Sequence, residues 1–351
     1  MKIPRESKAK ARWWRWVVPP WKRARIILAF FLVLLALVFG WTGCLPRRRS
    51  HEPLGQLLQG IDDGVRERVE NTVRELSGDV GPRYPPLGDS MARAAMVIER
   101  KWRELGFDVQ EQAYDVGGVE VKNLMVVLPG LQPELGIFVV GAHYDTCFDT
   151  PGADDNASGV ALLLELSRSL RGQQPERSIW LVAFACEEPP YFLTPDMGSV
   201  RLAHKLVADG IQVEGMISLE SLGYYRDEAK TQHYPSGLSL FYPNRGNFVA
   251  VVGNLSSNSL ARRVARLMKE HSQMPVETGV LPGWLPGVGW SDHWAFWKQG
   301  VAAVMLTDTA LFRNPHYHDW TDAVDTLNYD ALADLGMALP QIVLNLASAR
   351  Q

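Results

Sequence analysis

The chain has 351 residues, of which 46% are hydrophobic and 21% are charged, a globular composition that excludes wholesale disorder. Its net charge of −3 conceals an asymmetry, because residues 1–49 carry twelve Lys and Arg against one acid, which leaves 24 basic and 38 acidic residues in 50–351. A region that acidic would repel a phosphate backbone, so we expect no nucleic-acid partner.

The N-terminal region is predicted to anchor the chain in a membrane. Residues 26–46 carry no charge and, at about 1.5 Å per residue, are long enough to cross a hydrocarbon core of about 30 Å. Nine basic residues precede this segment and three follow it, so the basic tail, residues 1–25, is predicted to be cytoplasmic. We expect a single-pass protein of a bacterial inner (plasma) membrane with its main domain in the periplasm. The alternative is a lipoprotein signal that is cleaved before Cys44.

Residues 47–60 are predicted to be a linker, and residues 61–351 a single folded domain. Apolar residues recur at helical spacing over 62–77 and 89–105, and two strand-like stretches follow over 107–116 and 119–130. From residue 137 onward, apolar strands alternate with helices. The predicted strands are 137–143, 178–185, 215–221, 248–254 and 301–307, and the predicted helices are 157–170, 198–208, 258–271 and 329–348.

This alternation predicts an α/β fold with a mixed, mostly parallel central sheet and helices on both faces. Functional residues of such sheets gather at the carboxyl ends of the strands. Strand 137–143 ends in His143, a good metal ligand, and Asp145 could accept the other ring N–H. Asp154 and Asp155 lie in a glycine-flanked turn before a helix, which suits either a helix cap or a metal ligand.

Paired carboxylates follow the next apolar strand. Glu187 and Glu188 come directly after strand 178–185, where two adjacent charges are costly unless cations neutralise them. In a metal site one of them can bind the ion while the other acts as a general base. Glu220 follows a third apolar strand, and His318 lies in a polar loop after strand 301–307. Each feature alone has a structural explanation, but five of them at strand ends together indicate a metal site.

The order of these motifs resembles one family of metallopeptidases. HYD, PGADDNASG, EE, GS, LES, SDH and YH, spread over residues 85–345, are similar to bacterial secreted zinc aminopeptidases, aminopeptidase Y, glutamate carboxypeptidase and glutaminyl cyclase. The resemblance implies a phosphorylase/hydrolase-like fold. It also implies two Zn²⁺ ions, with other divalent metals possible, and a zinc-dependent exopeptidase that hydrolyses its substrate with a water activated by both ions.

The resemblance also assigns roles residue by residue. It implies that His143 and Glu220 bind one zinc, that Glu188 and His318 bind the other, and that Asp155 bridges the two. It further implies that Asp145 orients His143, that Glu187 is the general base, and that Tyr317 hydrogen-bonds the tetrahedral intermediate.

Three departures from the family pattern stand out. Glu220 replaces an Asp that most aminopeptidases of the family carry, which predicts altered spacing or affinity at the first metal. Residues 189–197 lengthen the turn after the paired glutamates and are predicted to reshape the rim of the pocket, and 318–322 replaces a more usual His-Thr-Pro-x-Asp. Cys147 and Cys186 are expected to be two small buried residues, although a disulfide between them is an alternative.

We therefore predict a membrane-anchored metallo-aminopeptidase that acts on peptides with a free N-terminus. The alternatives are a glutaminyl cyclase-like acyltransferase and a non-catalytic binding domain that is attached to the membrane. Ser291-Asp292-His293 is expected either to line the substrate pocket or to cap a helix, and 279–289 to be a lid or a plain connection. The sequence leaves the oligomeric state open.

Overall fold

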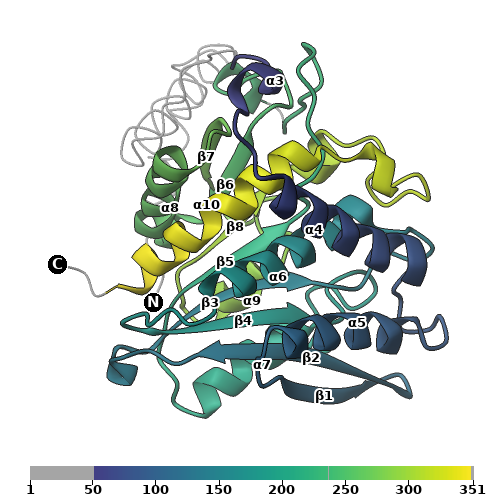
Figure 1. Cartoon of the computed structure of the whole chain (residues 1–351), viewed down its shortest axis with the longest axis vertical. Helices are drawn as coiled ribbons and strands as arrows, with labels where there is room; N and C mark the ends of the chain where they lie inside the picture. Colours follow the sequence, from purple (N-terminus) through teal and green to yellow (C-terminus); the bar gives the residue numbers. More distant parts are fainter. Residues whose placement is uncertain (1–50, 236, 349–351) are drawn as a thin grey trace, which may run out of the picture. The chain divides into compact units, whose positions relative to one another are not determined.

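An eight-stranded mixed sheet forms the centre of the computed structural model, which describes residues 51–235 and 237–348 (Figure 1). The strand order is β1-β2-β4-β3-β5-β8-β6-β7. Pairs β3–β4, β3–β5, β5–β8 and β6–β7 are parallel, whereas β1–β2, β2–β4 and β6–β8 are antiparallel, which confirms the predicted mixed, mostly parallel sheet. The strands are β1 (Gln110–Val116), β2 (Val119–Leu128), β3 (Ile137–His143), β4 (Ser178–Phe184), β5 (Val213–Glu220), β6 (Val249–Gly253), β7 (Val276–Val280) and β8 (Ala303–Thr307).

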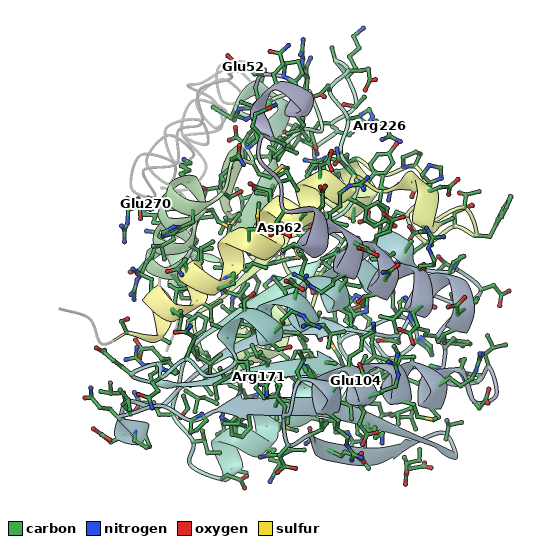
Figure 2. The ribbon with its side chains drawn as sticks, in the orientation of Figure 1. Glu52, Asp62, Glu104, Arg171, Arg226 and Glu270 are labelled. Atoms are coloured by element: carbon green, nitrogen blue, oxygen red, sulfur yellow. The ribbon has the colours of Figure 1, made fainter. Side chains whose placement is uncertain are left out.

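Helices cover both faces of this sheet, as predicted. On one face α6 packs over β3, β4 and β5 beside α10, and α8 packs over β6 and β8; on the other face α7 and α9 enclose a core with Phe184 and Phe296 (Figure 1). Charged side chains such as Glu104 and Glu270 lie on the outer surfaces of their helices, 61% and 46% exposed (Figure 2). The helices are α4 (Asp63–Val73), α5 (Ser90–Glu104), α6 (Gly159–Leu170), α7 (Gly198–Ala208), α8 (Asn258–His271), α9 (His293–Lys298) and α10 (Tyr329–Ala347).

The predicted elements are present with small shifts at their ends, and one strand was missed. The predicted helix over 62–77 starts as α4, capped by the Asp62 carboxylate on the Val65 N–H, and continues as the π-helical turn η1 (Arg74–Val80). Strand β7 was not predicted, because its five residues, VETGV, include a charge and a glycine and give no apolar run.

The segment before α4 contacts the domain. Residues 51–60, the described part of the predicted linker, include the one-turn helix α3 (Leu54–Leu57). Leu54 is buried, and its N–H donates to the Asp227 carboxylate. His51 Nε2 lies 2.9 Å from Glu277 Oε1 on β7. This stretch is therefore attached to the β6–β7 end of the molecule.

The predicted basic tail, 1–25, and the predicted anchor, 26–46, lie outside the described residues. Within residues 51–348, apart from 236, no helix combines the length and the apolar character that crossing a bilayer requires.

Candidate metal centre

Potential ligands meet at the carboxyl ends of three neighbouring strands. β4, β3 and β5 lie side by side and run parallel, so His143 at the end of β3, Glu187 just after β4 and Glu220 at the end of β5 reach the same edge of the sheet. Asp155 comes from the short π-helical segment η3 (Ala153–Ser158) before α6, and His318 from the loop after β8. The structure thus brings together the residues that the sequence singled out.

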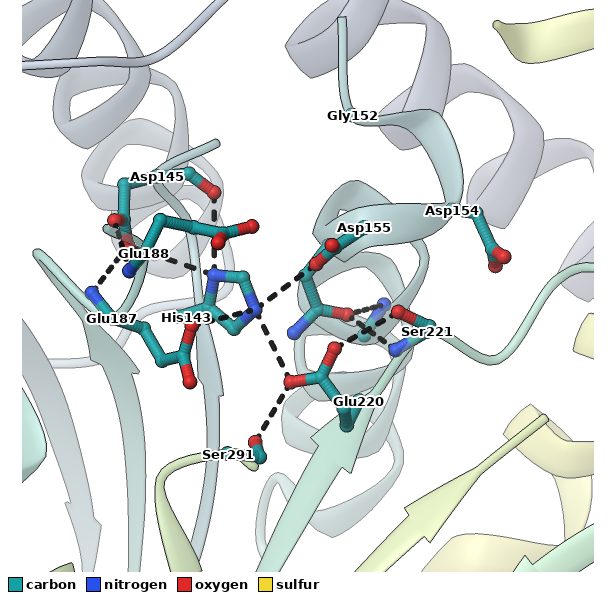
Figure 3. A network of polar contacts seen from close by, with 12 residues as sticks. His143, Asp145, Gly152, Asp154, Asp155, Glu187, Glu188, Glu220, Ser221 and Ser291 are labelled. Atoms are coloured by element: carbon teal, nitrogen blue, oxygen red, sulfur yellow. Dashed lines mark hydrogen bonds and ion pairs between the residues drawn. The ribbon is translucent and has the colours of Figure 1, made fainter. Parts of the chain in front are cut away.

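The first cluster surrounds the His143 ring (Figure 3). His143 Nε2 lies 3.3 Å from Asp155 Oδ1 and 3.2 Å from Glu220 Oε2. The ring is 1% exposed, and Glu187 Oε2 lies 4.0 Å from the same nitrogen. One imidazole nitrogen therefore faces three carboxylates in a space from which water is largely excluded.

The second cluster lies on the other side of Asp155. His318 Nε2 is 3.3 Å from Asp155 Oδ2 and 3.2 Å from Glu188 Oε2. The two oxygens of Asp155 thus face different clusters, which is the arrangement of a carboxylate shared by two cations. Cys147 Sγ also lies within 4.8 Å of the ligand atoms of Glu188 and His318. Cys147 and Cys186 are both buried free thiols in the structure, so the alternative of a disulfide is wrong.

A divalent cation fits these donors. Three buried atoms, His143 Nε2, Asp155 Oδ1 and Glu188 Oε1, have no hydrogen-bond partner among the described residues. Buried polar atoms are normally satisfied, and imidazole nitrogen with carboxylate oxygen is a donor set that zinc accepts. His143, Asp155 and Glu220 form one possible ligand group, and His318, Glu188 and Asp155 form the other.

The electrostatics of the centre also favour bound cations. Burial raises the pKa of Glu188 to about 8, reinforced by the Asp155 charge. Burial raises the pKa of Glu187 well above its ordinary value, and the nearby carboxylates of Glu188 and Glu220 raise it further. The pKa of Asp155 is instead lowered, because the rings of His143 and His318 outweigh its burial. Excess negative charge in a buried site is what a divalent ion would neutralise.

Asp145 lies beside His143, but its carboxylate has another task. Its two oxygens accept hydrogen bonds from the backbone N–H groups of Glu187 and Glu188, both at 3.0 Å. The carboxylate is 3.6 Å from His143 Nδ1, whereas the Asp145 carbonyl oxygen is 3.2 Å from that nitrogen. Asp145 therefore holds the turn that carries the paired glutamates and contacts the imidazole mainly through its backbone.

Glu220 is held by two hydroxyl groups. Ser221 Oγ donates to Oε1 at 2.9 Å, and Ser291 Oγ donates to Oε2 at 2.7 Å (Figure 3). These bonds fix the extra methylene that distinguishes Glu220 from the more usual Asp. Ser291 was predicted only as a pocket or cap residue, and its bond to Glu220 was missed because the two residues lie 71 positions apart.

Asp292 does not cap helix α9. The residue is fully buried, makes no side-chain cap hydrogen bond, and its burial raises its pKa to about 7. Its charge also contributes to the raised pKa of Glu187. Ser291 contacts the candidate ligand Glu220, but none of the three residues lines the apolar cavity, so the expectation that the tripeptide lines the substrate pocket stays a prediction.

Hydrogen bonds from neighbouring loops and one glycine shape the Asp154–Asp155 turn. The Asp322 carboxylate accepts from the N–H groups of Asp154 and Asp155, and the Asp154 side chain points away to the N–H of Gly223. Gly152 has φ 59°, and a Cβ there would lie 2.3 Å from the Asp155 carbonyl oxygen, so the turn requires glycine. Only Asp155 of the acidic pair faces the clusters.

A buried arginine that the sequence did not predict lies beside the candidate metal centre. The Arg83 guanidinium is fully buried and donates to the carbonyl oxygens of Leu76, Gly81, Tyr144, Pro151 and Gly152. Burial lowers its pKa to about 10. An isolated arginine after a Gly-Pro pair carries no local signal for such a role.

An apolar cavity opens from the first cluster. Its volume is about 100 Å³, and Glu220 and Tyr317 lie on its wall. The Tyr317 ring stacks on His318 with ring centroids 3.8 Å apart. Val288 and Trp290, in and just after loop 279–289, also line the cavity, so this loop borders the pocket, whereas residues 189–197 are not among its lining residues.

Residues 123–343 match the sequence pattern of peptidase family M28. The chain belongs to this family. A relative of similar length, the uncharacterized protein YfbL of Escherichia coli, is 36% identical over 320 residues, which cover 88% of this chain and 94% of YfbL. A probable zinc metalloprotease of Pyrenophora teres is 34% identical over 197 residues, 49% of this chain and 40% of that protein.

Solved structures show the same fold. The LapA aminopeptidase of Legionella pneumophila superposes with a TM-score of 0.66 at 19% identity, over 87% of this chain and 77% of LapA. Membership of the M28 family confirms the predicted resemblance and the prediction that the chain is a peptidase-type hydrolase.

Proposed function

We propose that this M28 chain is a two-zinc aminopeptidase that removes N-terminal residues from peptides. The observation that carries the proposal is Asp155, whose two oxygens face two separate His-carboxylate clusters. A relative named as a zinc metalloprotease and a structural neighbour named as an aminopeptidase support the choice of metal and of reaction.

Two zinc ions would be held by the clusters already described. His143 and Glu220 would bind the first, Glu188 and His318 the second, and Asp155 both. When bound, the ions would supply Lewis acidity, which lowers the pKa of water and polarises a carbonyl group. The chain's own residues then carry out the proton transfers.

Glu187 is proposed as the general base. Its carboxylate lies 4.0 Å from His143 Nε2, beside the first cluster, and burial raises its pKa, so it accepts a proton more readily than an exposed glutamate does. It would take a proton from the attacking water and return it to the leaving amine. Asp145 holds Glu187 in place through the Glu187 N–H.

Tyr317 and Glu220 are proposed to select and stabilise the substrate. The Tyr317 hydroxyl is proposed to donate to the negative charge that develops on the substrate's carbonyl oxygen. Glu220 borders both the first cluster and the apolar cavity, so a free α-amino group would be attracted to its carboxylate. That attraction would restrict cleavage to the N-terminus.

The test combines metal analysis with a substrate panel. The purified protein is expected to contain close to two zinc ions per chain, to cleave aminoacyl anilides but not N-acetylated ones, and to lose this activity when the metal is chelated. Full activity without metal would rule the proposal out. Ammonia release from a peptide with N-terminal Gln, without free amino acids, would indicate a glutaminyl cyclase-like reaction instead.

We further propose that residues 26–46 anchor the enzyme and that its domain lies outside the cytoplasm. The support is the charge asymmetry around that segment in the sequence. A reporter fused at the C-terminus is expected to be active only in the periplasm, and cytoplasmic activity would overturn the orientation. Mass spectrometry of the mature N-terminus would reveal a lipid on Cys44 if that alternative holds.

A further inference from the structure

The cavity beside the metal centre lies on the sheet face that also carries α7 and α9. Four residues form one row across adjacent strands, because Glu220 pairs with Thr307, Thr307 with Ala250, and Ala250 with Glu277. Paired residues of neighbouring strands point to the same face of a sheet. All four residues line the cavity.

This row forms a trench with a carboxylate at each end. Thr307 and Ala250, between the two glutamates, are small, and the next row along the strands, Met305, Val252 and Gly279, is apolar. With strands about 4.8 Å apart, the Cα atoms of the two glutamates at the ends are separated by about 14 Å, and both side chains point to the same face. Glu220 lies at the metal-centre end of the trench and Glu277 at the β7 end.

The Glu277 carboxylate is well placed to bind a cation. Its side chain is 13% exposed, and only Oε1 is within hydrogen-bond distance of His51. A carboxylate can accept several hydrogen bonds, so a second donor can be added. The rest of the cavity wall is mainly aliphatic and aromatic, including Phe248 and Leu281, and would pack against methylene groups.

Arginine matches this trench at both ends. Its α-amino and guanidinium nitrogens are seven bonds apart, or about 8–9 Å when extended. A hydrogen bond of about 2.9 Å at each end brings the span between the two carboxylates to about 14 Å. Lysine is about 1 Å shorter, and leucine would fill only the half of the trench near Glu220.

We propose that Glu277 determines specificity and that the enzyme prefers substrates with N-terminal arginine, followed by lysine. The α-amino group would lie at Glu220, the methylene chain over Thr307 and Ala250, and the guanidinium at Glu277. This inference rests on the proposed aminopeptidase function and adds the class of side chain that the enzyme accepts.

The test compares arginyl and citrullyl anilides, which have nearly the same shape but differ in charge. The zinc-loaded full-length protein is expected to show a kcat/KM about 10- to 100-fold higher for the arginyl substrate, the range expected for a hydrogen bond to a charged partner. Glu277→Gln, which preserves shape, should remove most of this ratio. Glu270→Gln removes an exposed charge on α8 and should leave the ratio unchanged.

A second variant tests whether the substrate side chain lies in the trench, without altering the charge of Glu277. Ala250→Leu would narrow the middle of the trench, so it should reduce arginyl cleavage at least tenfold more than alanyl cleavage. One outcome is that the wild-type enzyme cleaves leucyl anilide but cleaves arginyl anilide no faster than citrullyl anilide. That result would refute the preference for arginine and leave the aminopeptidase function standing. If the zinc-loaded protein cleaves none of these substrates, both proposals are refuted.

Discussion

The two halves of the sheet build their parts of the site in different ways. At the β4-β3-β5 end, the candidate ligands and the proposed base lie at the last residue of an apolar strand, such as His143, or just after it, such as Glu187. At the β8-β6-β7 end, the trench is built from alternate residues within strands, such as Ala250 and Glu277, and roofed by loops. In the proposed enzyme, the first half would supply reactivity through a dense set of charges, and the second would supply selectivity through its shape and one distant charge.

The largest effect is expected at the reactive end. Glu187→Gln removes the group proposed to transfer protons, so kcat should fall by at least about 10²–10⁴-fold while KM changes much less. Two zinc ions should remain bound, as measured by elemental analysis. Near-normal turnover with both metals in place would show that the proposed mechanism is wrong.

A somewhat smaller and partly reversible loss is expected for Glu188→Gln. This change removes a proposed ligand of the second metal, so zinc content should fall towards one ion and excess zinc should restore part of the activity. Zinc titration of wild type, Glu188→Gln and the surface control Glu270→Gln will measure it. If Glu187→Gln loses metal and Glu188→Gln keeps both ions, the two roles are reversed.

A Ser291 variant tests whether the first proposed metal site depends on the hydroxyl group that positions Glu220. Ser291→Ala removes the hydrogen bond to Glu220 Oε2, and loss of such a supporting group typically costs about 10- to 100-fold in metal affinity or activity. Competition with a chelator will measure the affinity of the first metal. Ser256→Ala, in an exposed turn, is the matched control. Unchanged affinity would mean that Glu220 is positioned by Ser221 alone.

The smallest expected effect is a pH dependence of the stability that bound zinc adds to the fold. The raised pKa values of Glu187 and Glu188 mean that the metal-free fold binds more protons than the unfolded chain between about pH 5 and 8. The raised pKa values of His143 and His318 act in the same direction above about pH 6.5.

Metal-free stability should therefore fall as pH rises, whereas metal binding becomes stronger because the ligands are deprotonated. The difference in Tm between zinc-loaded and chelated protein should widen from pH 5 to pH 8. A constant or narrowing difference would contradict this account of the charges. No such trend is expected from the trench, where charge is sparse.

The contrast between the two halves also explains what could be predicted from the sequence. A carboxylate after an apolar strand, as at Glu187 or Glu220, is a local pattern, and parallel strands bring such residues to one edge. The trench depends on the pairing of β5 with β8, which lie far apart along the chain, and on β7, whose sequence gives a weak strand signal. Arg83 and Ser291 act through tertiary contacts that no local spacing encodes.

The buried Arg83 has a consequence for how the centre opens. Its guanidinium connects η1 to the segments around Tyr144 and Gly152, all through backbone carbonyl groups. Loops are usually among the first parts of a protein to unfold locally. Here, moving any one of these segments away from Arg83 would expose the buried guanidinium and leave several carbonyl groups without their donor. The backbone amides of Tyr144 and Thr146, which donate to Phe184 and Arg83, should therefore exchange with deuterium about as slowly as those of the central strands. Slow exchange there would place the segment between His143 and Asp155 in the slowest-opening cooperative unit of the fold.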